Sequence, residues 1–230
     1  MGGFRESRSA LASVPLWLAL ACGSSTPRPP TTAAVPEKPT TPTPGERLGT
    51  VPDGVGLTIG DPAPDVTVTD ADGKPVRLLE LAKRGPILLV FYRGGWCPTC
   101  NFQIHELAKR FPELRQRGLT PVAISVDPPD DSARTRAAYA VPFPVLSDPE
   151  LAAHRAFKVV DPVTDDDVLD LKQAGVDRER HKMVAVPSIF VIGTDGKIYW
   201  SHADRDPRTR PTTDQILGAI DAQGPRPRWR

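Results

Sequence analysis

The apolar segment Ile87–Tyr92 (ILLVFY) is followed at once by RGGWCPTC, residues 93–100, and then by a helix-like pattern. A short continuous apolar run is typical of a strand buried in a parallel sheet. The apolar side chains from Cys97 to Arg117 fall largely on one helical face, and Pro98 suits a first helical turn. A cysteine pair that leaves a buried strand and opens a helix places its sulfurs at the positive end of that helix. The chain is thereby restricted to α/β folds.

Strand-like and helix-like blocks alternate through the rest of the chain. Pro112 is expected to kink or split the helix after the cysteines, and Gly118 to end it. Asp148 is expected to cap a helix, with Pro149 at its first position. The other elements are a hairpin from Val66 through the turn at 70–73, a strand at 121–126, helices at 131–139, 148–157 and 213–222, and a hairpin at 188–192 and 197–201. This order predicts a central mixed β-sheet flanked by helices.

The first residues predict export from a bacterial cell. Arg5 and Arg8 form a modest positive region, and Ala10–Ala21 is apolar but too short to cross a bilayer as a helix. The following residues resemble the bacterial lipobox, in which small residues precede a cysteine that becomes lipidated, here Cys22. The usual leucine three positions before the cysteine is Ala19. An ordinary cleaved signal and an N-terminal anchor therefore remain alternatives to a lipoprotein in the cell envelope.

Composition divides the rest of the chain. Residues 24–49 are rich in Pro and Thr with almost no large apolar side chain, which is typical of a disordered, extended tether. We therefore expect a signal peptide and lipobox at 1–22, a linker at 23–57, one folded domain at 58–222 and a basic tail at 223–230. The formal net charge is only +1, so no nucleic-acid partner is expected.

The two cysteines of the motif could exchange electrons, hold a metal or merely pack. If Cys22 is lipidated, Cys97 and Cys100 are the only thiols left. Structural zinc requires further ligands at short spacing, and the histidines are scattered at 105, 154, 181 and 202. Trp96 and two preceding glycines indicate an exposed, shaped loop rather than packing. Thiol redox chemistry, without metal or cofactor, is the favoured interpretation.

The reactive form of a cysteine is the thiolate. A free cysteine has a pKa of about 8.5, and a helix terminus contributes at most about 2 kcal/mol, which lowers that pKa by about one unit. Further donors are needed to stabilise the thiolate. We expect backbone N–H groups and Arg93, at the end of the strand, to supply them.

Five segments together resemble a known family. They are IGDPAPD (59–65), FYRGGWCPTC (91–100), AISVD (123–127), FPVLSDPELA (143–152) and VPSIFVIGTDGKI (186–198). In this order they resemble the AhpC/TSA (redoxin) branch of the thioredoxin-fold superfamily, particularly its peroxiredoxin-like group, over residues 58–222. The resemblance implies a thioredoxin-like fold and an antioxidant oxidoreductase. It also implies an external dithiol donor, either thioredoxin-like or a membrane reductase.

Carried over residue by residue, the peroxiredoxin signature P-x-x-x-T-x-x-C makes Cys100 the cysteine that attacks a hydroperoxide. Cys97 then stands at the threonine position and resolves, and Arg93 stands at the proline position. Gln103 replaces an acidic residue that is frequent in these enzymes. The arginine that activates the peroxide is expected near Val186–Pro187 and is missing there, which puts peroxidase activity in doubt.

The thioredoxin pattern W-C-x-x-C fits the same positions differently. Trp96 precedes the pair, Cys97 becomes the nucleophile that attacks a protein disulfide, and Cys100 resolves. Pro187 stands where thioredoxins have a cis-proline that receives an extended substrate segment. Phe91 replaces their buried acid. These matches slightly favour disulfide exchange led by Cys97, with a Cys100-led peroxidase as the alternative.

Three further interpretations concern His105, the acidic run at 161–170 and a function without catalysis. His105 is expected to be a half-exposed helix histidine outside the chemistry, and Asp161–Asp170 a solvated acidic surface rather than a calcium site. A redox-inert module that binds a partner in the groove beside Pro187 is the non-enzymatic alternative.

Overall fold

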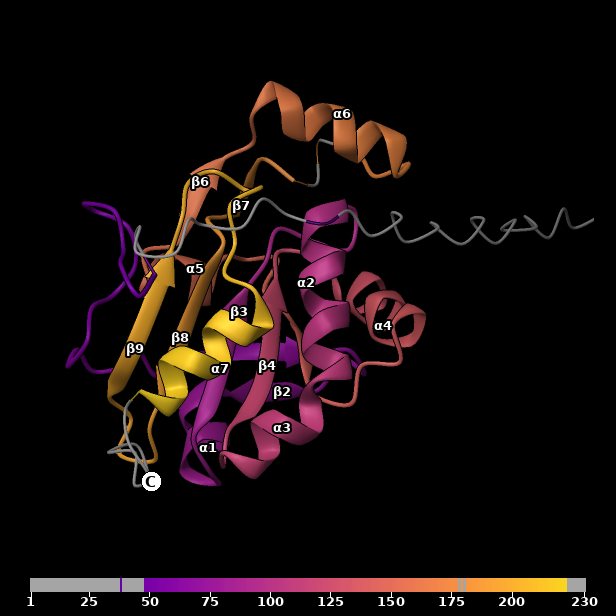
Figure 1. Cartoon of the computed structure of the whole chain (residues 1–230). Helices are drawn as coiled ribbons and strands as arrows, with labels where there is room; N and C mark the ends of the chain where they lie inside the picture. The colour runs from indigo at the N-terminus through magenta and orange to yellow at the C-terminus, as the bar shows by residue number, and fades with distance from the viewer. Residues whose placement is uncertain (1–37, 39–47, 178, 180, 223–230) are drawn as a thin grey trace, which may run out of the picture. The chain divides into compact units, whose positions relative to one another are not determined.

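The computed structural model describes residue 38 and residues 48–177, 179 and 181–222, all within the second of two compact units, 31–230. Strands and helices alternate as expected for an α/β fold (Figure 1). The strands are β1 (Thr67–Asp70), β2 (Pro75–Arg77), β3 (Ile87–Phe91), β4 (Thr120–Ser125), β5 (Val145–Ser147), β6 (Val160–Pro162), β7 (Met183–Ala185), β8 (Ser188–Ile192) and β9 (Ile198–Ala203). The helices are α1 (Leu78–Lys83), α2 (Pro98–Lys109), α3 (Phe111–Gln116), α4 (Pro129–Ala138), α5 (Ala152–Ala156), α6 (Asp165–Gln173) and α7 (Thr213–Asp221).

Seven strands form one mixed sheet in the order β2-β1-β5-β4-β3-β8-β9. The central strands β5, β4 and β3 are parallel, while β1 and β2 at one edge and β8 and β9 at the other pair antiparallel. The predicted central mixed sheet is therefore confirmed. Because β3 and β4 are neighbours, the loops that follow them meet at the same edge of the sheet.

Each face of β3 belongs to a different hydrophobic layer, because successive side chains of a strand point to opposite faces. Leu88 and Val90 belong to a cluster with buried residues of α2, α3 and α7. Leu89 and Phe91 belong to a second cluster with α1 and α5. Figure 1 shows α2, α3 and α7 in front of the sheet. All five β3 residues are buried, which explains the continuous apolar run in the sequence.

The helix after the cysteines is split, as predicted from Pro112. The first part, α2, ends at Lys109, and α3 begins at Phe111 with the proline in its first turn, where the missing N–H is tolerated. Gly118 follows α3 with φ of 79°, a left-handed conformation that favours glycine. Both local predictions are confirmed.

The helix predicted at Asp148–Phe157 is wrong at its start. Helix α5 begins at Ala152, and Leu151 precedes it with φ of 61°. The Asp148 carboxylate accepts the backbone N–H groups of Ala152 (2.9 Å) and His154 (3.0 Å) and also contacts the His154 ring (2.7 Å). Asp148 thus caps the helix from four residues before it, and Pro149 lies in the intervening turn.

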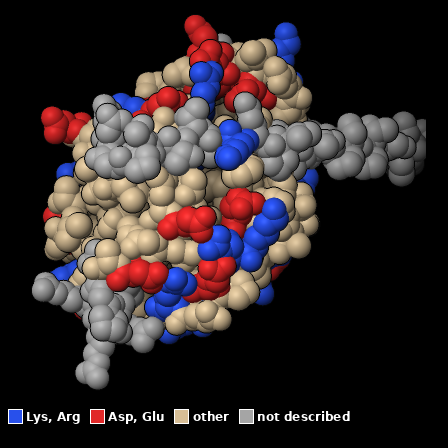
Figure 2. Space-filling view, in the orientation of Figure 1, with Lys and Arg blue, Asp and Glu red and all other residues tan. Residues whose placement is uncertain are grey.

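A second, two-stranded sheet of β6 and β7 carries α6 between its strands. Figure 1 shows this excursion beyond one end of the large sheet. Positive and negative side chains are mixed over the face seen in Figure 2, with no continuous basic surface there. No helix among the described residues is long and apolar enough to span a membrane.

The predicted segments at the two ends of the chain fall largely outside the described residues. The signal peptide and lipobox at 1–22 and the tail at 223–230 lie wholly outside them, as does most of the linker at 23–57. Within that linker range, Val55 and Leu57 are buried in the second hydrophobic cluster. The Ala203 N–H also donates to the Thr50 carbonyl (2.9 Å), so contacts with the domain include residues before 58.

Candidate active site

Cys97 and Cys100 form a disulfide at the start of α2, with their Cα atoms 5.3 Å apart. Cys97 is the N-cap residue, and its sulfur accepts the backbone N–H of Cys100 (3.3 Å). Pro98 occupies the first turn. The sequence prediction of a strand, a cysteine pair and a helix N-terminus is therefore met in the geometry, and the N-cap position stabilises negative charge on Cys97.

The motif loop is buried, and the expectation of an exposed loop is wrong. The exposed fractions are 3 % for Trp96, 2 % for Cys97 and 0 % for Cys100. The Trp96 ring packs inward, with the Arg93 guanidinium 5.2 Å from its centroid and the His181 ring 6.3 Å away on edge. The space that an added Cβ at Gly94 would need is taken by Trp96, whose Nε1 would lie 2.2 Å from it. The glycines allow close packing rather than exposure.

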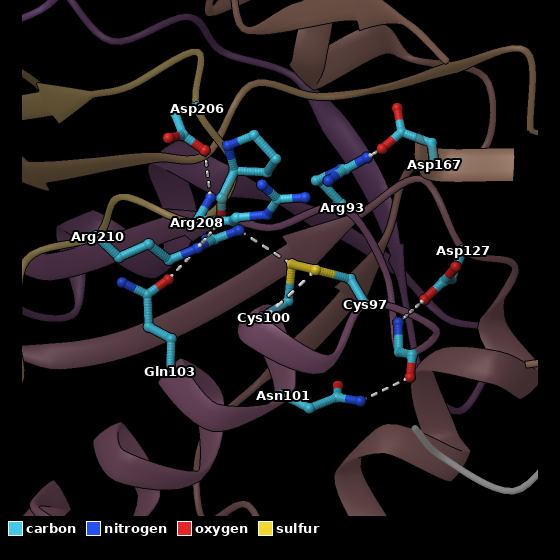
Figure 3. The surroundings of a disulfide bond; sticks show 12 residues. Arg93, Cys97, Cys100, Asn101, Gln103, Asp127, Asp167, Asp206, Arg208 and Arg210 are labelled. Atoms are coloured by element: carbon cyan, nitrogen blue, oxygen red, sulfur yellow. Dashed lines mark hydrogen bonds and ion pairs between the residues drawn. A yellow bond between two sulfur atoms is a disulfide. The ribbon is translucent and has the colours of Figure 1, made fainter. Parts of the chain in front are cut away.

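The side chains of Asp127 and Asn101, labelled in Figure 3, hydrogen-bond to the backbone of Gly95, two residues before Cys97. The Gly95 N–H donates to Asp127 Oδ2 (2.7 Å), and its carbonyl accepts from Asn101 Nδ2 (2.8 Å). Asp127 follows β4, and Gly95 follows the neighbouring parallel strand β3. The loop after β4 therefore holds the loop after β3 in place. The other carboxylate oxygen, Oδ1, lies 3.1 Å from His181 Nε2. The backbone before Cys97 is therefore held by hydrogen bonds from α2 and from the loop after β4, and His181 in turn contacts the Asp127 carboxylate.

Arg93 faces the cysteine pair, as the sequence indicated, and is buried. Burial lowers its pKa to about 10. Its guanidinium forms an ion pair with Asp167 of α6, which has an exposed fraction of only 3 %. The expectation that Asp161–Asp170 is a solvated acidic surface is therefore wrong at Asp167. One carboxylate of this acidic run turns inward because a buried guanidinium needs a partner.

An arginine that the sequence analysis missed reaches the disulfide from the loop between β9 and α7. Arg210 is 1 % exposed, and its Nη2 lies 3.1 Å from the Cys100 sulfur (Figure 3). Its Nη1 donates to Gln103 Oε1 (2.9 Å) and its Nε to the Pro207 carbonyl (3.1 Å). Burial, and then the nearby Arg93 guanidinium, lower its pKa to about 9. An arginine is thus present at the Cys100 sulfur, although none stands at 186–187.

Pro187 does not reproduce the thioredoxin cis-proline, because no peptide bond in the described part of the chain is cis. The proline precedes β8, the antiparallel neighbour of β3, and so lies near the end of the motif strand. It lines a cavity of about 70 Å³ together with Arg93 and Pro207. Its position beside the site agrees with the sequence pattern, whereas the bond geometry does not.

The remaining candidates from the sequence are Phe91, His105 and a metal site. Phe91, at the position of the thioredoxin acid, packs against Phe157 and Phe190 with ring centroids 5.1 and 5.9 Å away. His105 is half-buried and contacts the ring of Tyr139 at 5.8 Å. Among the residues that the structure describes, no group of three or more His, Cys, Asp or Glu side chains could hold a metal ion.

A sequence model of the AhpC/TSA family matches residues 59–201. The chain belongs to the AhpC/TSA family. This match includes the motif loop, Asp127, the β6–α6–β7 excursion and Pro187, whereas Arg210 lies beyond it. The predicted family and the thioredoxin-like fold are confirmed.

Curated relatives of this AhpC/TSA protein carry two kinds of redox name. A Mycobacterium tuberculosis protein named "Putative peroxiredoxin" is 32 % identical over 145 residues, covering 62 % of this chain and 82 % of its own. The 1-Cys peroxiredoxin PER1 of Triticum aestivum is 27 % identical over 174 residues, 73 % of each chain. The thiol-disulfide oxidoreductase ResA of Bacillus anthracis is 30 % identical over 93 residues, 40 % of this chain and 53 % of its own.

Solved structures agree on the fold. Peroxidoxin BcpB from Mycobacterium tuberculosis superposes with a TM-score of 0.57 at 24 % identity, covering 73 % of this chain and 97 % of that one. Reduced Prx3 from Vibrio vulnificus in complex with hydrogen peroxide superposes with a TM-score of 0.61 at 14 % identity, covering 71 % and 99 %. The AhpC/TSA protein is therefore an oxidoreductase with a thioredoxin-like fold, and the redox-inert module is set aside.

Proposed function

We propose that this AhpC/TSA protein is a thiol-dependent peroxidase in which Cys100 attacks the hydroperoxide and Cys97 resolves. The contact between Arg210 Nη2 and the Cys100 sulfur, 3.1 Å long, carries the proposal. A thiolate is the nucleophile, and a guanidinium at hydrogen-bond distance stabilises it against the neutral thiol. In the sequence, Trp96 and Pro187 slightly favoured Cys97, and the missing arginine put peroxidase activity in doubt. The contact of Arg210 with Cys100 reverses that preference.

The proposed cycle has three balanced steps. The Cys100 thiolate attacks a peroxide oxygen, the O–O bond breaks, and with one proton from solvent the products are Cys100 sulfenic acid and an alcohol or water. Cys97 then attacks the sulfenic sulfur, forming the disulfide and releasing water. An external dithiol donor reduces the disulfide and is itself oxidised. The Cα separation of 5.3 Å at the folded start of α2 accommodates the disulfide without unfolding of the helix.

Disulfide exchange led by Cys97 is the second candidate function. One observation favours it: the Cys97 sulfur is the N-cap acceptor of α2, which stabilises a thiolate at that position as well. In this version Cys97 attacks a disulfide of a protein substrate, and Cys100 displaces the substrate thiolate. Both candidates use the same residues and the same external donor. They differ in the substrate and in the cysteine that attacks.

Parallel reactions of the reduced protein separate the two candidates. The full chain carries Cys22→Ser, so that only two thiols remain, and is mixed with hydrogen peroxide or with glutathione disulfide. We expect the peroxide reaction to exceed that of free cysteine by at least about 10²-fold, as befits an activated thiolate. A peroxide rate equal to that of free cysteine, together with rapid reaction of the disulfide, would refute the peroxidase and establish the second candidate.

We also propose that the protein is exported and anchored to the bacterial envelope through lipidated Cys22. The charged start, the apolar segment of 10–21 and the small residues before Cys22 support this. In a bacterial expression host, radiolabelled palmitate should enter the wild-type protein and the Cys97→Ser control, and both should sediment with membranes. Cys22→Ser should lose both label and sedimentation. Label that persists in Cys22→Ser would contradict the anchor.

A further inference from the structure

Among the described residues, no anion contacts the buried Arg210 guanidinium in the disulfide form. Its hydrogen-bond contacts within the described residues are to a carbonyl, a side-chain amide oxygen and a disulfide sulfur, none of which carries a full negative charge. No carboxylate of the described residues forms an ion pair with it. A buried, unpaired charge destabilises the state that contains it. The oxidised protein is that state.

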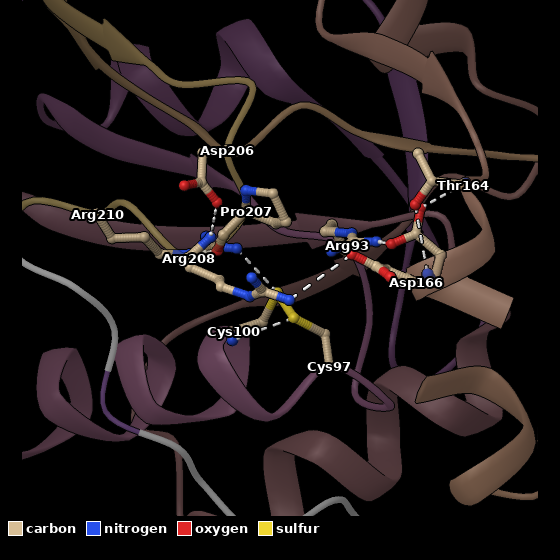
Figure 4. A network of polar contacts seen from close by, with 10 residues as sticks. Arg93, Cys97, Cys100, Thr164, Asp166, Asp206, Pro207, Arg208 and Arg210 are labelled. Carbon is tan, nitrogen blue, oxygen red and sulfur yellow. Dashed lines mark hydrogen bonds and ion pairs between the residues drawn. A yellow bond between two sulfur atoms is a disulfide. The ribbon is translucent and has the colours of Figure 1, made fainter. Parts of the chain in front are cut away.

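The neighbouring charges are already occupied or lie farther away (Figure 4). Arg93 pairs with Asp167, Arg208 lies 3.6 Å from Asp166, and Arg205 pairs with Asp161 at 2.6 Å. Asp127 contacts His181 and the Gly95 N–H. Asp204 and Asp206 act on Arg210 only through space, opposing the effects of burial and Arg93. Reduction of the disulfide adds the one new anion within hydrogen-bond distance of Arg210.

We propose that Arg210 sets the redox equilibrium of the pair, because it stabilises the dithiol form with Cys100 as a thiolate and leaves the disulfide form with an unpaired cation. This rests on the Cys97–Cys100 cycle of the proposed function, in which Cys100 is the attacking thiolate. The disulfide is therefore a comparatively strong oxidant. A donor of moderate reducing strength, such as a monothiol, can reset it.

If Cys100 is a thiolate after reduction, the reaction of the disulfide with glutathione releases one proton to solvent. Two glutathione molecules reduce the disulfide, two electrons enter the S–S bond, and glutathione disulfide forms. Cys97 keeps one proton, Cys100 remains a thiolate, and the second proton is released to solvent. The equilibrium constant for reduction consequently rises tenfold per pH unit above the pKa of Cys100. If both cysteines were protonated, no net proton would be released and the constant would not change with pH.

The test is the glutathione equilibrium of the full chain carrying Cys22→Ser, followed from pH 6 to 8 by alkylation and mass spectrometry. We expect the equilibrium constant to rise about a hundredfold over this range, since Cys100 is a thiolate throughout and glutathione remains largely protonated. In Arg210→Met it should be nearly constant and, at pH 7, lower by at least about tenfold, which is about 30 mV for a two-electron couple. Arg210→Lys should retain the pH dependence.

Arg84 provides a matched control, because it is exposed at the end of α1, before the start of β3, whereas the motif follows the other end of that strand. Arg84→Met removes the same charge and should leave the equilibrium unchanged. An unchanged equilibrium in Arg210→Met would overturn the proposal. If that variant does not fold, thiolate absorbance in Cys22→Ser/Cys97→Ser replaces it, and a Cys100 pKa of 8.5 or above overturns the proposal. A glutathione equilibrium with the expected pH dependence, in a protein with Arg210 intact that reacts with peroxide no faster than free cysteine, would instead count against the proposed function alone.

Discussion

Cys100→Ser is expected to slow peroxide consumption by the reduced protein by at least about 10³-fold, because it removes the nucleophile itself. The serine hydroxyl cannot ionise near neutral pH, so Arg210 has no thiolate to stabilise. The remaining thiol, Cys97, is at the N-cap of α2 and lacks an arginine contact among the described residues. The initial rate of peroxide loss, measured in the Cys22→Ser background, checks this.

Cys97→Ser is the matched control for that prediction. It removes the resolving thiol and leaves Cys100 with its Arg210 and Gln103 neighbours, so the first turnover should keep its rate within about threefold. The reaction should then stop at Cys100 sulfenic acid, which dimedone traps for mass spectrometry. Fast peroxide consumption by Cys100→Ser with slow consumption by Cys97→Ser would exchange the roles of the two cysteines.

Asp167→Asn is expected to lower the free energy of unfolding by about 3–5 kcal/mol, because it leaves the Arg93 guanidinium buried without its ion-pair partner. Asparagine keeps an oxygen that can accept the Thr164 N–H, the capping bond that Asp167 Oδ2 makes at 2.8 Å. The substitution therefore removes the charge and retains the cap. Urea unfolding of the disulfide form, compared with the unsubstituted protein, measures the loss.

The adjacent residue controls for charge and for position on the helix. Asp166 has a side-chain exposure of 88 % and lies 3.6 Å from Arg208. Asp166→Asn should therefore change stability by less than about 1 kcal/mol, as is usual for an exposed pair. Equal losses in the two variants would show that the buried ion pair does not hold α6 against the motif strand.

Local patterns in the sequence predicted most of the fold. The apolar run of β3 predicted a strand buried on both faces, and Pro112 predicted the break between α2 and α3, because both effects act within a few residues. Asp148 was misplaced because its carboxylate caps α5 across an intervening turn. The cysteine pair at the start of α2 followed from the strand, loop and helix signals together.

The surroundings of the cysteines could not be predicted in the same way. Arg210 contacts Cys100 from 110 residues later in the chain. Asp167 lies on α6 and contacts Arg93, which follows β3. Neither contact has a periodicity or spacing in the sequence. The one visible signal was the arginine-rich run at 205–210 (RDPRTR), which composition alone assigns to a surface loop. Tertiary packing turned one of its arginines inward and buried an aspartate of α6.

The central claim is that Cys97 and Cys100 exchange between a dithiol and a disulfide at the expense of hydroperoxide. Its most direct test mixes the reduced Cys22→Ser protein with one equivalent of hydrogen peroxide, alkylates the remaining thiols and maps the peptides. The account predicts one Cys97–Cys100 disulfide per peroxide consumed, with both thiols lost together. Sulfinic acid on either cysteine as the main product, or peroxide that persists beside two alkylated thiols, would contradict it.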